Sequence, residues 1–302
     1  MELGGLDLSF ILNKPLLKEL ISVILAVLSS VMVGGVIFSV SGADPLLAYS
    51  ALITGALIGK HQIAETIVKT TPLLFASLGV ALAFKSGLWN VGAEGQIVIG
   101  SLVAAWLGFS IMGLPTIIHI LLTMIFSFLG GAMWALIPGI LKAKANINEV
   151  LTTLMMNYIA YWISVYVIYW PLDDPLSYNP QTPHVLPSAM LPTLIPGTRA
   201  HAGILLAIVG AILLIIMKKS IFGYEIKVVG ANPAAAKSAG INVPKIILTT
   251  MVISGGLAAL GGMTEVIGRD LCLKLDATLG YGYLAVAIAL VGNLNPIGVI
   301  FS

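Results

Sequence analysis

The sequence predicts an all-α fold, a polytopic integral membrane bundle of about eight membrane-spanning helices in a single transmembrane domain over 1–302. Of the 302 residues, 58% are hydrophobic and only 9% are charged, whereas a soluble domain usually carries about 25% charged residues. Apolar runs of about 20 residues, the length that a helix needs to cross a bilayer, also recur along the chain. These charges are too few to cover the surface of a soluble domain, so we expect the chain to lie in a lipid bilayer.

Eight segments have the length and apolar character of membrane spans. They are 17–40, 66–84, 90–111, 115–140, 149–170, 201–217, 246–267 and 280–292. The first is longer than the apolar core of a signal peptide, so we expect a retained anchor helix. The second and the last are short or broken, which leaves the count open by about one span. A new apolar run begins after Pro296 and stops within a few residues, so we expect a C-terminally truncated chain whose complete form has more helices.

Lysine and arginine residues indicate which loops are cytoplasmic, because positive charges concentrate on that side of the membrane. If the N-terminus is inside, two thirds of them also fall inside, namely Lys14, Lys18, Lys85, Lys142, Lys144, Lys218, Lys219, Lys227, Lys237 and Lys245. The others fall outside, namely Lys60, Lys69, Arg199, Arg269 and Lys274. The opposite orientation inverts this bias. We therefore expect a cytoplasmic N-terminus, a cytoplasmic loop at 218–245 and an external loop at 171–200.

Small residues recur at every fourth position in two of the predicted spans. The two sets are Gly131, Ala135 and Gly139, and Ser254, Ala258 and Gly262. Helices in lipid associate through such faces because their backbones can approach closely. The two sets therefore predict tight packing between helices.

The segment KSGLWNVGAEGQIVIG at 85–100 interrupts the apolar pattern between two long spans. Its glycines at 87, 92 and 95 free the backbone from a regular helix. A bilayer tolerates such a break only where protein packs around it or where it lines a cavity. We therefore predict a broken helix near 87–96 that faces the interior of the bundle.

Three polar residues lie in this segment, Asn90, Glu94 and Gln96. An unpaired carboxylate in the hydrocarbon costs at least about 2.5 kcal/mol, so Glu94 should face the interior of the bundle. Transporters build substrate contacts from interrupted helices of this kind. We predict that the three residues lie along a translocation path. The alternative is that Glu94 bonds the freed backbone amides and only holds a kink.

A second polar group lies in NEVLTTLMMNYIAYW at 148–162. Asn148 has the position of a helix N-cap, and Glu149 in the first turn suits the positive end of the helix dipole, so capping accounts for both residues. Asn157 is different, because it lies inside an apolar helix. It should contact another helix or a polar path, and we include it among the residues of the predicted translocation path.

The most polar loop, 218–245, contains the helix-forming sequence PAAAKSA between Gly230 and Gly240. Pro233 suits the first turn of this helix, Asn232 can cap it and Gly240 can end it. A helix of two turns is marginal alone, so packing on a partner should hold it; the alternative is an ordinary helix within a loop between two spans. Its alanines at 235, 236 and 239 leave room for close docking in a groove of that partner.

No motif of an enzyme or of a metal site is present. The phosphate-loop pattern fails at Thr54 and His61, and neither a nucleophile elbow nor a zinc-protease motif occurs. The four histidines share no metal-ligand spacing. A net charge of +2 without a basic run argues against a nucleic-acid partner. We therefore expect no catalytic residue, no bound metal and no nucleic acid.

Three segments, in the same order, resemble one transporter family. The sequence VG-x-N-P-x-A-A-x-x-A-G-I in the polar loop looks like the cytoplasmic coupling loop of ABC-importer permeases. GLWNVGAEGQ resembles a segment of the branch that takes up nucleosides, which is related to the ribose and branched-chain amino-acid permeases, and NEVLTTLMMNYIA is similar to that branch too. The matches extend over about 85–267.

The resemblance implies roles for particular residues. The coupling helix, which sits in a groove of the ATPase subunit, would comprise Gly230, Asn232, Pro233, Ala235, Ala236, Ala239, Gly240 and Ile241. Asn90, Glu94 and Gln96 would lie by the translocation path. The resemblance also implies a plasma-membrane permease that pairs with a second, homologous or identical permease, with ABC ATPase subunits and with an external substrate-binding lipoprotein. ATP would be used by the ATPase subunit, and this chain would bind no cofactor.

Two other function classes stay open at this point. An ion-coupled secondary transporter of small polar solutes would need inverted repeats and an ion site near the middle of the membrane, and neither is evident. An intramembrane enzyme lacks its motifs. Nucleosides fit the resembling branch, with simple sugars next and amino acids after them. Trp89, Tyr158 and Trp162 could stack on a base, although interfacial or packing roles account for them as well.

Overall fold

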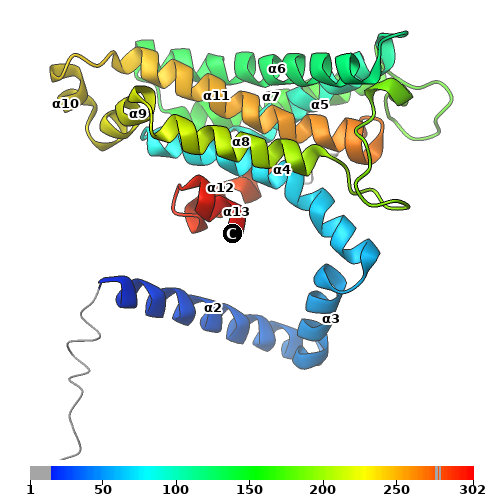
Figure 1. Ribbon diagram of the computed structural model, residues 1–302, viewed down its shortest axis with the longest axis horizontal. Coiled ribbons are helices and arrows are strands. Elements are labelled where there is room, and N and C mark those ends of the chain that lie inside the picture. The colour runs from blue at the N-terminus through cyan, green and yellow to red at the C-terminus, as the bar shows by residue number, and fades with distance from the viewer. Residues whose placement is uncertain (1–14, 276–277, 279) are drawn as a thin grey trace, which may run out of the picture. The chain divides into compact units, whose positions relative to one another are not determined.

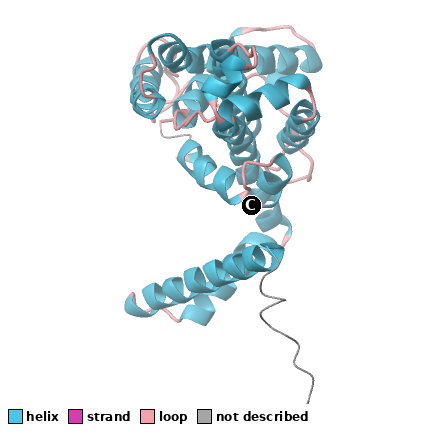
Figure 2. Cartoon of the chain, turned by 90° about the vertical axis from the view of Figure 1, so that its left-hand side faces the viewer, coloured by secondary structure: helices cyan, strands magenta, loops and turns pink. Residues whose placement is uncertain are grey.

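The computed structural model describes residues 15–275, 278 and 280–302, except for the side chains of 15–24 and 26. The described residues form helices joined by turns and loops, with no strand among them (Figure 2). They fall into two units, Met1–Ile63 and Ala64–Ser302. The predicted all-α membrane fold is thus confirmed.

The first unit contains α2 (Pro15–Val40) and α3 (Pro45–Leu57), which meet at a bend of 116°. None of the eight predicted spans covers α3, which lies within 41–65. Asp44 caps this helix: its carboxylate accepts a hydrogen bond of 2.8 Å from the backbone amide of Leu46. A proline occupies the first helical position. An N-cap and a proline are local signals for the start of a helix and do not depend on a long apolar run. A search for apolar runs alone therefore does not find α3.

The second unit holds the remaining helices. They are α4 (Lys60–Lys85, which begins just before the boundary), α5 (Ala93–Ser110), α6 (Thr116–Ala145), α7 (Glu149–Tyr169), α8 (Gly203–Lys218), α9 (Ile221–Ala231), α10 (Pro233–Ser238), α11 (Val243–Thr264), α12 (Tyr281–Val291) and α13 (Pro296–Phe301). A short 3₁₀ turn, η1 (Pro187–Ala189), lies in the 171–200 loop, and a π-helix, η2 (Glu265–Asp270), continues α11.

Each of the eight predicted spans coincides with a helix, but not every one of these helices is long enough to cross a membrane alone. Among the described residues, five helices are long and apolar enough: α4, α5, α6, α7 and α11 with its π-helical continuation. Two bent pairs, α2 with α3 and α8 with α9, raise the number to at most seven. The last predicted span, α12, is a shorter apolar helix. The chain is therefore polytopic, and its described residues supply five to seven candidate spans where the sequence predicts about eight.

The centre of the second unit is α11, which packs along α6 and α5 (Figure 1). A Cβ atom on Gly131 of α6 would overlap the backbone of Gly255, and one on Gly255 would overlap that of Gly131. On its other side, Gly262 of α11 lies against the backbone of Ile97. The small residues thus let three helices approach at backbone distance, as the sequence predicted.

Candidate functional site

The connection between α4 and α5 is the predicted break, and a buried amide pair holds it in place. The Asn90 side chain donates a hydrogen bond of 2.8 Å to Ser254 Oγ of α11 and accepts one of 3.0 Å from the backbone amide of Gly92. Asn90 and Gln96 also exchange two hydrogen bonds of 3.1 Å. Both side chains are fully buried. They fasten the break to α11 and do not line the cavity described below.

Glu94, in the first turn of α5, binds the first turn of α12. Its carboxylate accepts a hydrogen bond from the Thr278 hydroxyl and another, of 2.6 Å, from the amide of Gly282. The first amides of a helix lack partners inside it, so the carboxylate satisfies one of them and suits the positive end of the α12 dipole. Gly282 packs so closely on the backbone of Glu94 that a Cβ atom would not fit there. The carboxylate therefore lies where two helix N-termini meet.

Asn157 of α7 joins the same region from a third helix. Its side-chain oxygen accepts the amide of Gly95 at 2.8 Å, and its nitrogen donates to the carbonyl of Val91 at 3.0 Å and to the Tyr283 hydroxyl at 3.4 Å. These contacts confirm that it reaches another helix. Most of its hydrogen-bonding capacity is used to hold the α4–α5 break against α7.

A cavity of about 540 Å³ opens between α5, α7 and the start of α12. Glu94 and Asn157 line it, together with Val98, Thr278 and Gly280. Four aromatic side chains also line it, namely Tyr158, Tyr161, Trp162 and Tyr283. A carboxylate among aromatic rings can accept hydrogen bonds from a polar ligand while the rings stack on a flat one.

Two of the four predicted path residues, Glu94 and Asn157, line this cavity, and Asn90 and Gln96 do not. Thr278 and Tyr283, which also line the cavity, are not among the predicted path residues. Tyr283 lies in the short predicted span 280–292, and Thr278 lies just before it. Trp89, the third aromatic candidate, is not among the residues that line the cavity: it is half exposed and packs on Phe84 with ring centres 4.7 Å apart. Glu149, predicted to serve the helix start, also forms an ion pair of 2.9 Å with Lys142, and Asn148 caps α7 as predicted.

The polar loop 218–245 contains two helices rather than one. The predicted helix is α10, which Asn232 caps by accepting the amides of Ala234 and Ala235 at 3.0 and 3.1 Å. Gly240 follows it with a φ of 81°, a left-handed conformation that suits glycine after a helix C-terminus. The unexpected helix is α9, which Ser220 caps.

One expectation for α10 is wrong. Ala236 was expected to face a partner, but it is fully buried and packs on Ile226 and Val229 of α9 and on Ile246 of α11. Ala235 and Ala239, one turn apart, are exposed instead. The inner face of α10 thus belongs to the fold, and any docking surface must be its outer face.

The polar loop also contacts the α4–α5 break directly. Gly230 of α9 lies against the backbone of Lys85 and Ser86, and a Cβ atom at this position would overlap them. Gly87, with a φ of 78°, approaches the Cα atom of Gly230 so that its own Cβ would lie 3.4 Å away. The two glycines bring the end of α9 into backbone contact with the segment that leads to Glu94.

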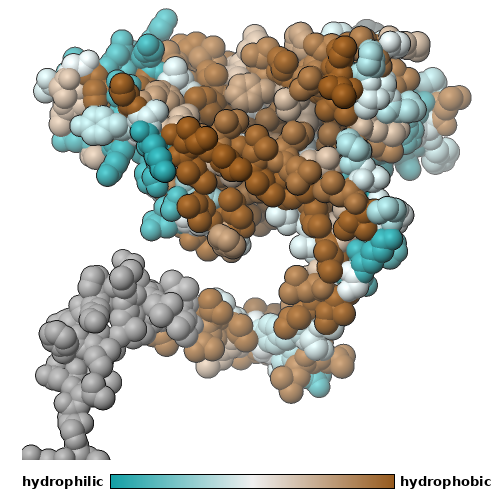
Figure 3. Space-filling view, viewed as in Figure 1, coloured by the Kyte–Doolittle hydropathy of each residue, from teal (hydrophilic) through white to brown (hydrophobic). Residues whose placement is uncertain are grey.

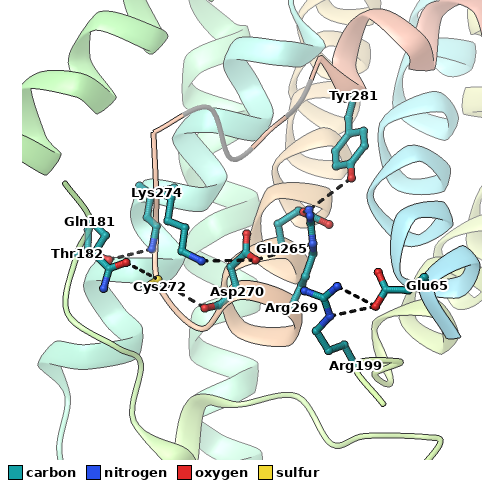
Figure 4. A network of polar contacts seen from close by, with 11 residues as sticks. Glu65, Gln181, Thr182, Arg199, Glu265, Arg269, Asp270, Cys272, Lys274 and Tyr281 are labelled. Atoms are coloured by element: carbon teal, nitrogen blue, oxygen red, sulfur yellow. Dashed lines mark hydrogen bonds and ion pairs between the residues drawn. The ribbon is translucent and has the colours of Figure 1, made fainter. Parts of the chain in front are cut away.

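A network of ion pairs lies near the C-terminal end of α11, and Figure 4 shows its side chains. Arg269 pairs with the buried Glu265 one turn earlier in the π-helix and donates to the Tyr281 hydroxyl at 3.5 Å. Arg199 binds Glu65 at 2.9 Å. The four-residue spacing of Glu265 and Arg269 was a signal in the sequence. Tyr281 precedes Gly282, so the network adjoins the cavity that holds Glu94.

The described residues contain no group of three histidine, cysteine, aspartate or glutamate side chains that could hold a metal ion.

Residues 62–302 match the family described as branched-chain amino acid transport system / permease component. The chain belongs to this family. No solved structure matches it.

Three curated relatives of this permease are similar over most of its length. The guanosine ABC transporter permease of Bacillus subtilis is 36% identical over 293 residues, which cover 95% of this chain and 83% of the relative. The nucleoside ABC transporter permease of Lactococcus lactis is 32% identical over 96% of this chain and 82% of its own. The glucose ABC transporter permease of Haloferax volcanii is 32% identical over 91% and 75%.

Proposed function

We propose that this permease forms the translocation path of an ATP-driven ABC importer and that the path carries nucleosides. The observation that carries the proposal is the cavity in which Glu94 lies among four aromatic side chains. A nucleoside offers a flat base for stacking and ribose hydroxyls that can donate to a carboxylate. The similarity to permeases for guanosine and for nucleosides supports the same substrate class.

A simple sugar is the second candidate, because a glucose permease is about as similar to this chain as one of the nucleoside permeases. Sugars also pack on aromatic rings and donate hydroxyls to carboxylates. Four aromatic residues around one carboxylate favour the larger flat base. An amino acid fits less well, since the described residues that line the cavity include no lysine or arginine to bind its carboxylate.

The importer would need partners on three sides. A cytoplasmic ABC ATPase would receive the outer face of α10, and an external substrate-binding lipoprotein would deliver the substrate at the end of the bundle that holds Arg199 and Arg269. A second permease subunit, homologous or identical, would cover α7. The cavity opens beside Tyr158 and Trp162, which are largely exposed on that helix. Two permeases meeting there would enclose the path between them.

The alternative is an ion-coupled secondary transporter, in which Glu94 would bind the coupling ion. The carboxylate already accepts two hydrogen bonds, and no second acidic residue is among the described residues that line the cavity. Uptake of labelled guanosine into vesicles separates the two mechanisms, because the importer requires ATP and no ion gradient.

We expect the α10 region to be cytoplasmic and the 171–200 loop to be external. Tyr178 is fully exposed in that loop and Ser238 is exposed at the end of α10, so cysteines placed at either position are accessible. Cys272 is buried, and burial raises the pKa of its thiol, so the native cysteine should react little with maleimide. Cys272 is nevertheless replaced with serine in both labelling variants.

In intact cells, a membrane-impermeant maleimide should label the Tyr178→Cys variant and spare the Ser238→Cys variant. Permeabilised cells provide the control, since both positions should then be labelled. Labelling of position 238 but not 178 in intact cells would invert the orientation and remove α10 from the side on which an ATPase works.

A further inference from the structure

A second cavity, of about 390 Å³, opens between the ends of α4, α8 and α9 and the segment that joins α12 to α13. Among the residues that the structure describes, none lines both this cavity and the one around Glu94. Figure 3 shows hydrophilic side chains over the α9 end of the unit beside the apolar surface of α8. The cavity thus lies where an apolar face meets a polar one.

The rim of this cavity is strongly basic. Lys85, Lys218, Lys219 and Lys227 all line it, and no aspartate or glutamate is among its described lining residues. No ion pair to these lysines occurs in the part of the chain that the structure describes, and Lys218 only donates to the Asn295 side chain at 3.4 Å. Lys85 feels the repulsion of Lys218 and Lys227. A bound anion would relieve this repulsion.

The wall of the cavity is apolar. Leu78 and Leu82 of α4 face Leu214 and Met217 of α8 across it, deeper along both helices than the lysines. A small soluble anion would use only the rim, whereas a phospholipid presents a phosphate to the lysines and an acyl chain to the leucines. Basic pockets between membrane helices on the cytoplasmic side recognise anionic lipid headgroups in this way.

We propose that this cavity binds an anionic phospholipid of the inner leaflet, with its phosphate on Lys85, Lys218 and Lys227 and its acyl chain against Leu82 and Met217. The choice of leaflet rests on the orientation in the proposed function. Lys85 ends α4 where Gly230 touches it, so the lipid would brace the α8–α9 bend and the contact between α9 and the α4–α5 break.

The test is retention of lipid by the purified protein. The protein is extracted in mild detergent and titrated with equal amounts of phosphatidylglycerol and phosphatidylcholine. Native mass spectrometry then measures how much of each lipid stays bound. The wild type should retain phosphatidylglycerol in preference by about tenfold or more, given the contribution of each lysine near an anionic headgroup. Replacing Lys85, Lys218 and Lys227 together with glutamine should abolish the preference.

A matched control removes the same charge elsewhere on the predicted cytoplasmic side. Lys144, Lys237 and Lys245 do not line the cavity, so their joint replacement with glutamine should leave the preference unchanged. A second variant, Leu82→Trp, keeps every lysine but fills the apolar wall, and it too should lose phosphatidylglycerol. Thermal unfolding checks that all variants stay folded.

Three results would overturn the proposal. The lysine variant could keep the preference. Inorganic phosphate could displace the lipid while Leu82→Trp has no effect, which would indicate a site for free anions. Binding of phosphatidylglycerol could be unchanged while the ATPase no longer co-purifies with the lysine variant, which would indicate a protein interface. The assay uses neither ATP nor transported substrate, so its failure leaves the importer mechanism standing.

Discussion

Replacing Ala235 with tryptophan should abolish ATP-driven uptake while the chain still inserts in the membrane. Ala235 is exposed on the outer face of α10, and Ala239 lies one turn further along the same face. A tryptophan there would overfill the proposed contact with an ATPase, whereas Ala235 takes no part in the packing that holds α10 to α9 and α11. We expect co-purification of the ATPase to fall by about tenfold or more, which corresponds to about 1.4 kcal/mol.

Two variants separate docking from folding. Ala235→Ser changes the same position by one atom and should bind the ATPase normally. Ala236→Trp should instead destabilise the chain, because Ala236 is fully buried and overpacking a well-packed site costs about 1–3 kcal/mol. If Ala235→Trp and Ala239→Trp both retain the ATPase and transport normally, α10 is not the coupling element.

Replacing Glu94 with glutamine should lower uptake of nucleosides by about thirtyfold, because a hydrogen bond to a charged group is worth about 2 kcal/mol. Glutamine keeps the size of the side chain and one acceptor for Thr278 or Gly282, so the chain should remain folded. The charge that faces the cavity is lost. Labelled guanosine uptake and thermal unfolding, measured on the same preparation, report the two effects separately.

The competing role for Glu94 is purely structural, a tie between α5 and α12. Thr278→Val removes one hydrogen bond of that tie and leaves the charge. If the carboxylate only ties the helices, Thr278→Val should impair uptake as much as Glu94→Gln does. Glu225→Gln on α9 controls for the loss of one negative charge. Wild-type uptake in both Glu94→Gln and Glu94→Ala would exclude a role in the path.

Local features of the structure could be predicted from the sequence. Asn148 and Asn232 cap the helices that follow them, and Gly240 takes the left-handed conformation after α10. These features depend on residues within one turn of each other, so the order of residues suffices to find them. The glycine and alanine sets predicted close helix packing for a similar reason, since they lie on single helix faces.

The partners of the site residues could not be predicted in this way. Glu94 meets Thr278 and Gly282, which are 184 and 188 residues away. Asn90 forms a hydrogen bond with Ser254, 164 residues away. It therefore holds the α4–α5 break to α11 and is not among the residues that line the cavity. Only packing decides such pairs. The same holds for Ala236, because the sequence showed small residues on α10 but not which side α9 would cover.

Guanosine uptake by sealed vesicles tests the central claim most directly. Vesicles holding this permease with the proposed ATPase and second permease are loaded with ATP, given the proposed binding lipoprotein outside, and supplied with labelled guanosine in the absence of any ion gradient. We predict uptake that stops when ATP is omitted, that unlabelled adenosine inhibits, and that excess glucose or leucine leaves unchanged. Uptake driven by a sodium or proton gradient without ATP would contradict the account.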